Sequence, residues 1–168
     1  DRLYNVPVDE LMEVMYNSIE QGYTIAWAAD VSDKGFSWNK GVAVVPARDF
    51  EDMSDTEKAK WEDLTEEEQE KMLYNFDGPG EEKQITQQMR QEAFNNWNTT
   101  DDHGMHITGI ARDQEGNRYF IVKNSWSDED HIYDGYFYAS DAYVRYKTMD
   151  IMVHKDAIPQ DIAEKLGL

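Results

Sequence analysis

The sequence predicts an α+β fold in which helices precede a curled antiparallel β-sheet. In much of the chain before about residue 98, apolar residues recur at helical spacing, and Pro, Ser or Thr stands at the starts of the segments. From His103 onward, runs rich in aromatic and β-branched residues follow a period of two and are separated by turn-forming stretches such as DQEGN. Helices followed by strands are typical of α+β domains, and 168 residues suffice for one domain with its own core.

The first segment predicts a helix and then a buried strand. VPVDELMEVMYNSIEQGY has Pro7 where a first helical turn tolerates it, Asp9 near the positive end of the helix dipole, and Gly22 where the pattern stops. We therefore expect a helix over residues 7–21. The following YTIAWAADV is rich in β-branched and aromatic residues and has no helix cap, which predicts a strand.

A helical and acidic insert is expected over about residues 50–98. Ser54 with Glu57, and Thr65 with Glu68, are capping-box signatures that predict two short acidic helices with solvated faces. A further helix is expected in EEKQITQQMRQEAFNNWNT, where four apolar residues lie four apart along one side: Ile85, Met89, Ala93 and Trp97.

The antiparallel sheet is expected over about residues 103–156, and a short helix closes the chain. We interpret HGMHITGIARD, NRYFIVKNSW and the whole of GYFYASDAYVRYKTMDIMVHK as strands. IPQDIAEKLGL predicts the final helix because Pro159 stands near its start.

Charge and composition exclude several classes of partner. The chain has 35 acidic and 16 basic side chains, and its net charge of −19 repels phosphate backbones and anionic membrane surfaces. We therefore expect no nucleic-acid partner and no membrane partner. Because the chain has no cysteine, it can form neither a disulfide nor a thiolate metal site.

The stretch DDHGMH offers two histidines three positions apart. On a helix they would share a face and could bind a metal, but ITGIA indicates a strand, on which His103 and His106 point to opposite faces. We therefore expect no metal and no other cofactor, and we interpret His106 as a partly buried structural histidine.

His103 and Asn124 are candidates to pair across neighbouring strands. Each is a polar side chain at the edge of an apolar strip, and an imidazole N–H donated to the amide oxygen would satisfy both groups. A tight turn centred on Glu115 and Gly116 places Asn124 opposite Ile107, roughly 13 Å from His103 along the strand. Contact requires a turn nearer Asp113, a bulge or a strong twist, and the pattern leaves these alternatives open.

DDHGMHITGI, YFIVKNSWS and GYFYASDAYVRYKTMDIMVH together resemble the histidine and asparagine blocks of papain-like cysteine peptidases. The similarity is greatest to the bleomycin hydrolase and bacterial aminopeptidase C branch, which residues 5–36 and the C-terminal region also resemble. The resemblance implies a papain-like fold, of which this chain would be the C-terminal portion bearing His103 and Asn124. The Asn-Ser-Trp motif is matched by residues 124–126.

The resemblance implies a role for each matching residue. His103, preceded by Asp102, would be the general acid and base, and Asn124 would orient its ring. Trp126 would shield the hydrogen bond between them from water. In this branch the C-terminus restricts cleavage to the amino end of peptides, a role that would fall to Leu168 here.

Three features depart from the family pattern. The block that carries the nucleophilic cysteine is absent, Ser127 replaces the usual glycine after the tryptophan, and Gly104 replaces a common alanine. We therefore expect a peptidase that acts on peptide substrates. Its cysteine should lie on an N-terminal portion upstream of Asp1, so that this chain alone is inactive. The resemblance also implies a homo-oligomer for the intact protein. The alternative is a catalytically inactive papain-like binding module.

Overall fold

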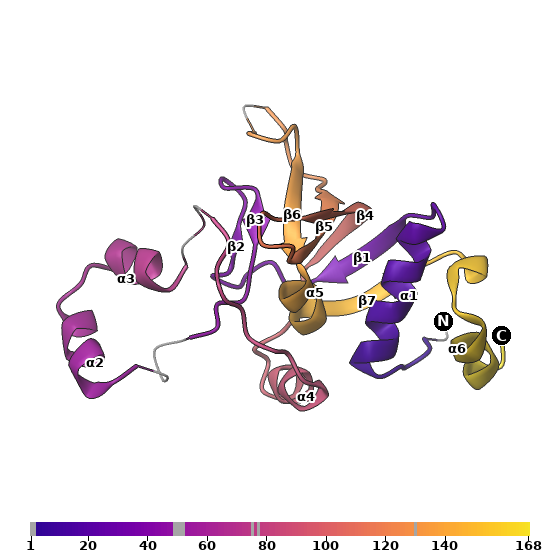
Figure 1. Ribbon diagram of the computed structural model, residues 1–168, viewed down its shortest axis with the longest axis horizontal. Coiled ribbons are helices and arrows are strands. Elements are labelled where there is room, and N and C mark those ends of the chain that lie inside the picture. The colour runs from indigo at the N-terminus through magenta and orange to yellow at the C-terminus, as the bar shows by residue number, and fades with distance from the viewer. Residues whose placement is uncertain (1–2, 49–52, 75, 77, 130) are drawn as a thin grey trace.

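A computed structural model describes residues 3–48, 53–74, 76, 78–129 and 131–168 (Figure 1). The start of the expected acidic insert, near residue 50, lies outside these residues. In chain order the elements are α1 Val8–Glu20, β1 Ile25–Ala29, β2 Phe36–Ser37, β3 Val42–Ala43, α2 Asp55–Glu62, α3 Glu66–Leu73, α4 Gln87–Asn95, β4 His103–Arg112, β5 Arg118–Lys123, β6 Tyr136–Ser140, α5 Asp141–Lys147, β7 Thr148–Met152, the 3₁₀ turn η2 Lys155–Ala157 and α6 Gln160–Leu166.

A single curled sheet organises the described part of the chain. Its strand order is β2-β3-β6-β5-β4-β1-β7, so the early strand β1 lies between β4 and β7. The expected α+β class is confirmed, but the sheet is not purely antiparallel, because β3 pairs with β6 in parallel. Nor do the helices all precede the sheet, since three of its strands lie before residue 50.

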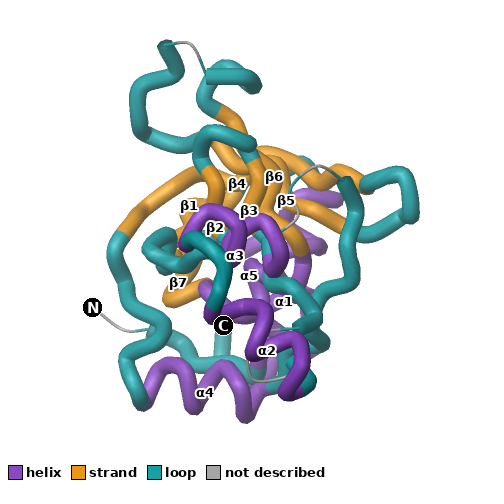
Figure 2. Tube along the Cα trace, turned by 90° about the vertical axis from the view of Figure 1, so that its left-hand side faces the viewer, coloured by secondary structure: helices purple, strands orange, loops and turns teal. Residues whose placement is uncertain are grey.

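One face of the sheet forms the core with α1 and α5. Met12 and Met15 of α1 pack with inward-facing strand residues such as Trp27 and Phe120, all fully buried. The buried indole of Trp27 donates its N–H to the hydroxyl of Thr148 over 2.8 Å, which satisfies a polar group that burial would otherwise leave unpaired. Figure 2 shows the strands gathered in the upper part of the molecule, with α4 below them.

Helix α5 corrects the strand expected through residues 141–147. Ser140 caps this helix by accepting the Tyr143 N–H at 3.0 Å, and Asp141 lies in its first turn. Tyr143 and Val144 are fully buried, so apolar side chains that suggest a strand instead form the inner side of a two-turn helix. The expected helix over residues 7–21 matches α1 closely.

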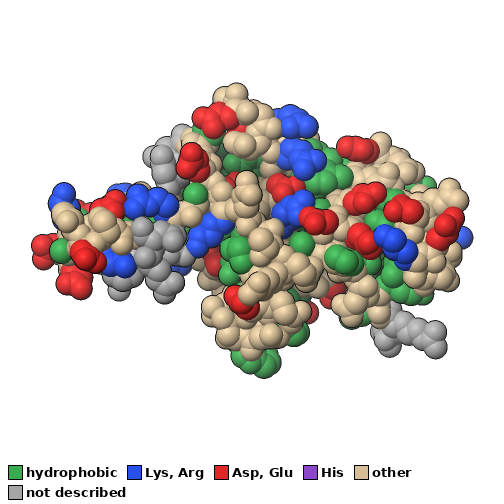
Figure 3. Space-filling model, turned by 60° about the horizontal axis from the view of Figure 1, so that its bottom comes forward, with side chains coloured by type: hydrophobic (Ala, Val, Ile, Leu, Met, Phe, Trp, Pro, Cys, Tyr) green, Lys and Arg blue, Asp and Glu red, His purple; other side chains and the backbone are tan. Residues whose placement is uncertain are grey.

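Helices α2 and α3 extend away from the sheet (Figure 1). Both expected capping boxes form, since the Ser54 hydroxyl accepts the Glu57 N–H and the Thr65 hydroxyl accepts the Glu68 N–H. Helix α2 buries none of its residues, as the solvated-face interpretation requires. Figure 3 shows acidic and basic side chains interspersed over this end of the molecule.

Helix α4 is shorter than the apolar spacing suggested. It begins after Thr86, whose hydroxyl accepts the Met89 N–H, and ends at Asn95. Trp97 therefore lies beyond the helix, with a positive φ of 65° and 82% of its surface exposed. The expectation that Trp97 packs along the helix was wrong, because the chain turns away before reaching it.

Among the described residues, no helix combines the length and apolarity needed to cross a membrane.

Candidate active site

A β-bulge brings His103 and Asn124 together. His103 begins β4, and Asn124 directly follows β5. The pairing runs Ile107 with Val122 but Gly109 with Ile121, so Thr108 is an extra residue in β4. The bulge shifts the register toward His103, and the remaining separation is bridged by a hydrogen bond of 2.7 Å between His103 Nε2 and Asn124 Oδ1.

This bond fixes which ring nitrogen of His103 carries the proton. The backbone N–H of Ser125 donates to the same side-chain atom of Asn124 over 2.7 Å, which identifies that atom as the amide oxygen. An amide oxygen only accepts, so Nε2 of the neutral His103 ring must be the donor and Nδ1 is left able to accept a proton. Asn124 is 3% exposed, and its Nδ2 has no hydrogen-bond partner among the described residues.

Trp126 lies against the ring of His103. Its ring centroid is 4.9 Å from that of His103, with the two planes inclined by 34°. Phe36 and Trp38 support the indole from the side through edge-to-face contacts at 5.7 and 5.4 Å. Trp126 is 41% exposed, and apart from His103 its ring contacts only these two aromatic rings among the described residues.

Two aspartates anchor the segment that leads into His103. Asp102 accepts the Val31 N–H at 3.1 Å, and Asp30 accepts the Thr100 N–H at 3.2 Å. The end of β1 is thereby attached at two points to the chain that enters β4.

Asp30 is itself a buried, paired carboxylate rather than an ordinary loop side chain. It is 2% exposed, and its Oδ2 lies 3.6 Å from Nζ of the equally buried Lys147. Burial alone would raise the pKa of Asp30, but hydrogen bonds from Ser32, the charge of Lys147 and the Thr100 N–H lower the pKa below its usual value.

Leu168 lies apart from His103 and Asn124. It follows α6, is 55% exposed, and donates its N–H to Ala163 within the same helical end. His103 pairs with Ala29 at the end of β1, whose arrowhead points away from α6 in Figure 1. The described contacts do not bring Leu168 to the other candidate residues.

His106 lies on the outer face of the sheet and is exposed, opposite Ala26 on β1 and Lys123 on β5. The expectation of a partly buried structural histidine was therefore wrong, because no layer of the described chain covers this face at position 106. Within the described residues, no cluster of three His, Asp or Glu side chains could hold a metal ion.

Sequence reasoning missed the residues that support Trp126. Phe36 belongs to the two-residue strand β2, Trp38 follows that strand directly, and His131 lies in the loop after the Asn-Ser-Trp motif. The His131 ring stacks on Trp38 with centroids 3.8 Å apart. Loop sequences carry no periodic signal, so only the aromatic content of residues 36–38 hinted at this contact.

The two substitutions within the motifs are accommodated. Open space surrounds the position that a Cβ would occupy at Gly104, so an alanine would fit there. Ser127 is not among the described residues with positive φ, so its position does not demand glycine.

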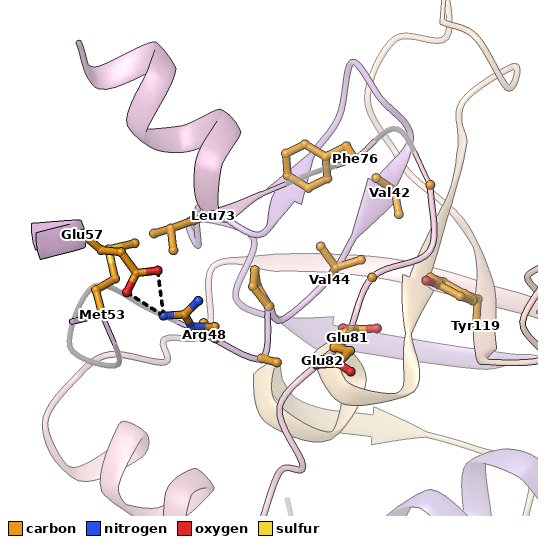
Figure 4. A pocket seen from close by; sticks show the side chains of 14 residues that line it. Val42, Val44, Arg48, Met53, Glu57, Leu73, Phe76, Glu81, Glu82 and Tyr119 are labelled. Atoms are coloured by element: carbon orange, nitrogen blue, oxygen red, sulfur yellow. Dashed lines mark hydrogen bonds and ion pairs between the residues drawn. The ribbon is translucent and has the colours of Figure 1, made fainter. Parts of the chain in front are cut away.

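A cavity of about 280 Å³ lies between β3 and the α2–α3 segment (Figure 4). Its walls include Val44 and Leu73, an ion pair of 3.2 Å joins Arg48 to Glu57, and Tyr119 lines the opposite side. Burial raises the pKa of Tyr119 to about 12, with the charge of Glu82 acting in the same direction. None of the candidate residues His103, Asn124 or Trp126 lines this cavity.

Comparison with known proteins places these observations in a family context. The model of the Peptidase C1-like family matches residues 73–167, which include His103, Asn124 and Trp126. The crystal structure of PepW from Lactobacillus rhamnosis HN001 (DR20) superposes with a TM-score of 0.59 at 18% sequence identity, over 96% of this chain and 30% of PepW. This chain thus spans less than a third of the length of PepW. No curated protein matches its sequence.

Proposed function

Because this chain belongs to the Peptidase C1-like family, we propose that it supplies the acid–base half of a cysteine peptidase site. His103 is the general acid and base, Asn124 orients the His103 ring, and Trp126 shields their hydrogen bond. The nucleophilic cysteine comes from a portion of the protein outside these 168 residues, which contain none. The substrate is a peptide.

The observation that carries this proposal is the 2.7 Å bond between His103 Nε2 and Asn124 Oδ1. It leaves Nδ1 of the neutral ring free to take a proton, and the Ser125 N–H holds the amide oxygen in place. A histidine held in one tautomer by a third group is what an activated nucleophile requires.

The reaction then proceeds in balanced steps. Nδ1 of His103 takes the thiol proton, giving a thiolate and an imidazolium that Asn124 stabilises through Nε2–H. The thiolate attacks the peptide carbonyl, and His103 returns its proton to the leaving amine as the C–N bond breaks. In deacylation the neutral ring accepts a proton from water, whose oxygen attacks the thioester carbon, and the proton then passes to the departing sulfur.

Aminopeptidase specificity is a finer part of the proposal. It rests on the resemblance of the histidine and asparagine blocks to the bleomycin hydrolase and aminopeptidase C branch. The structure separates Leu168 from His103, so the contacts of this chain provide no support for a role of Leu168 in that specificity.

A catalytically inactive binding module is the second candidate, because the chain contains no cysteine. In that case the groups around His103 would bind a peptide segment without cleaving it. The two candidates make opposite predictions for the product of the whole gene.

The test uses the whole gene product and two matched histidine substitutions. If the proposal holds, the protein hydrolyses fluorogenic aminoacyl amides and loses activity on thiol alkylation. His103→Ala should lower kcat/KM by at least about 100-fold, within the range for general acid–base groups. His106→Ala, on the outer face of the same strand, should leave kcat/KM unchanged. A gene product without a thiol and without activity would instead support the binding module, whereas full activity of the His103→Ala variant would reject His103 as the acid–base group.

A further inference from the structure

The loop that carries Trp126 is exposed over much of its length and needs support from outside. Ser125, Ser127, Asp128 and Glu129 are all exposed. At the base of the loop, the Asn124 N–H donates to the Gly135 carbonyl oxygen over 3.0 Å. Backbone pairing therefore closes the loop next to Asn124 but does not by itself fix the direction of the Trp126 side chain.

His131 is the hydrogen-bonding centre of this loop. Its Nδ1 accepts the backbone N–H groups of Tyr133 and Gly135 at 3.3 and 3.2 Å. Its Nε2 lies 2.9 Å from the carbonyl oxygen of Trp38. Because Nδ1 accepts two N–H groups, it carries no proton, and Nε2 must be the donor to Trp38. The contacts thus require the neutral ring in one tautomer.

An unbroken row of rings leads from His131 to the candidate site. His131 stacks on the indole of Trp38 at 3.8 Å with an interplanar angle of 23°. Trp38 contacts Trp126 edge to face at 5.4 Å, and Trp126 in turn covers His103 at 4.9 Å. The position of each ring limits that of the next, because edge-to-face and stacked geometries are directional.

From these contacts we propose that neutral His131 is a positioning residue that holds Trp38, and through it Trp126, over the His103–Asn124 hydrogen bond. The catalytic significance of this arrangement rests on the proposed function, whereas the positioning itself does not. His131 touches none of the reacting groups. It acts by determining how well the bond between His103 and Asn124 is shielded.

The first test measures tautomers and hydrogen exchange by ¹⁵N NMR on the chain itself. The expected result is a His131 ring protonated at Nε2 only, and a His103 Nε2–H whose exchange is slowed by Trp126. His131→Ala should accelerate that exchange at least tenfold. His131→Phe, which keeps a ring for stacking but removes all three hydrogen bonds, should give an intermediate rate.

His154→Ala is the matched control. His154 also stacks on an aromatic ring, that of Tyr23 at 4.7 Å, and also accepts a backbone N–H through Nδ1, that of Asp156 at 3.3 Å. Its substitution should leave exchange at His103 unchanged. The proposal is overturned if His131 is protonated at Nδ1, or if His131→Ala leaves exchange at His103 unchanged while the amide spectrum shows a folded chain.

The second test separates positioning from the proposed function. In the cysteine-bearing protein, His131→Ala should lower kcat more than it raises KM, since it disturbs the proton-transferring group rather than a substrate contact. Altered exchange at His103 in a protein without peptidase activity would reject the proposed function and retain the positioning role. Unaltered exchange in an active peptidase would reject the positioning role alone.

Discussion

Nε2 of His103 lies 2.7 Å from Oδ1 of Asn124, although 21 positions separate the two residues in the chain. Without the bulge, the observed pairing of Arg112 with Arg118 would continue regularly and leave Asn124 opposite His106, whose side chain lies on the outer face. The extra residue at Thr108 shifts the register and keeps both Ile107 and Ile110 on the core side of β4. One bulge therefore keeps the apolar side chains of β4 in the core and also allows two polar side chains to meet at the end of the hairpin.

Replacing Asn124 with alanine should release the His103 ring. The change removes the acceptor for Nε2–H, so ¹⁵N NMR should show both neutral tautomers instead of one. Loss of a buried hydrogen-bond partner should also lower the free energy of unfolding by about 1–2 kcal/mol, measured by urea denaturation. In the cysteine-bearing protein kcat/KM should fall at least about tenfold, because a misplaced base costs transition-state geometry.

Asn117→Ala provides a comparison for that substitution. Asn117 also makes side-chain hydrogen bonds, but to Asp113 in the exposed turn of the same hairpin. It should leave the His103 tautomer unchanged. A single Nε2–H tautomer that persists in Asn124→Ala would show that Asn124 does not orient the ring.

Replacing Trp126 with alanine should expose the bond beneath it. The variant loses edge-to-face contacts with Phe36 and Trp38, which predicts a loss of about 1–2 kcal/mol in unfolding free energy. Exchange of the His103 Nε2–H should become faster. Trp97→Ala is the natural control, because Trp97 is 82% exposed and its removal should change stability by less than about 0.5 kcal/mol. Equal exchange rates of the His103 Nε2–H in the wild type and in Trp126→Ala would show that Trp126 does not shield the hydrogen bond.

Much of the scaffold could be predicted from the sequence, because local signals determine it. The capping boxes at Ser54 and Thr65 and the span of α1 follow from side chains that bond to their own backbone or share one face. Helix α5 could not be recognised in the same way. Its residues Tyr143, Val144 and Tyr146 favour strands locally, and the Ser140 cap and tertiary burial override that preference.

Part of the candidate site also could not be predicted from local sequence signals. Strand alternation places His103 and Asn124 on the same face, but alternation contains no information about a bulge at Thr108. The support of Trp126 by Trp38 and His131 depends on two loops separated by more than 80 residues. Such contacts are set by packing in three dimensions, which a single sequence does not encode as a pattern.

Gly41→Ala should destabilise the support of the site through a steric clash. A Cβ built on Gly41 would lie 2.4 Å from the nearest ring carbon of Tyr133, which follows His131 in the loop, and Gly41 has φ of +64°. The expected loss in unfolding free energy is about 2–3 kcal/mol, measured by urea denaturation. Gly22→Ala separates the two causes, since Gly22 also has positive φ but open space around it, and should cost only about 1 kcal/mol. Equal costs would mean that Tyr133 moves aside freely.

Asp30→Asn should weaken the attachment of β1 to the entrance of β4, and it should do so in a pH-dependent way. At pH 7 the change leaves Asp33, at 2.8 Å, as the remaining carboxylate partner of buried Lys147 among the described residues, so we expect a loss of about 2–4 kcal/mol in unfolding free energy. The folded-state pKa of Asp30 lies below its usual value of 3.8, so the ionised carboxylate stabilises the folded chain fully above that pH. As pH falls through the lowered folded-state pKa, the wild type acquires a neutral side chain at Asp30, and the difference in unfolding free energy between the two proteins should shrink.

Urea denaturation of both proteins across this pH range measures that difference. The control is exposed Asp150→Asn, which is expected to change stability by less than about 0.5 kcal/mol. A difference that stayed constant down to the lowest pH would mean that the Asp30 charge contributes nothing, and that the asparagine acts through altered hydrogen bonding to Ser32 and Thr100.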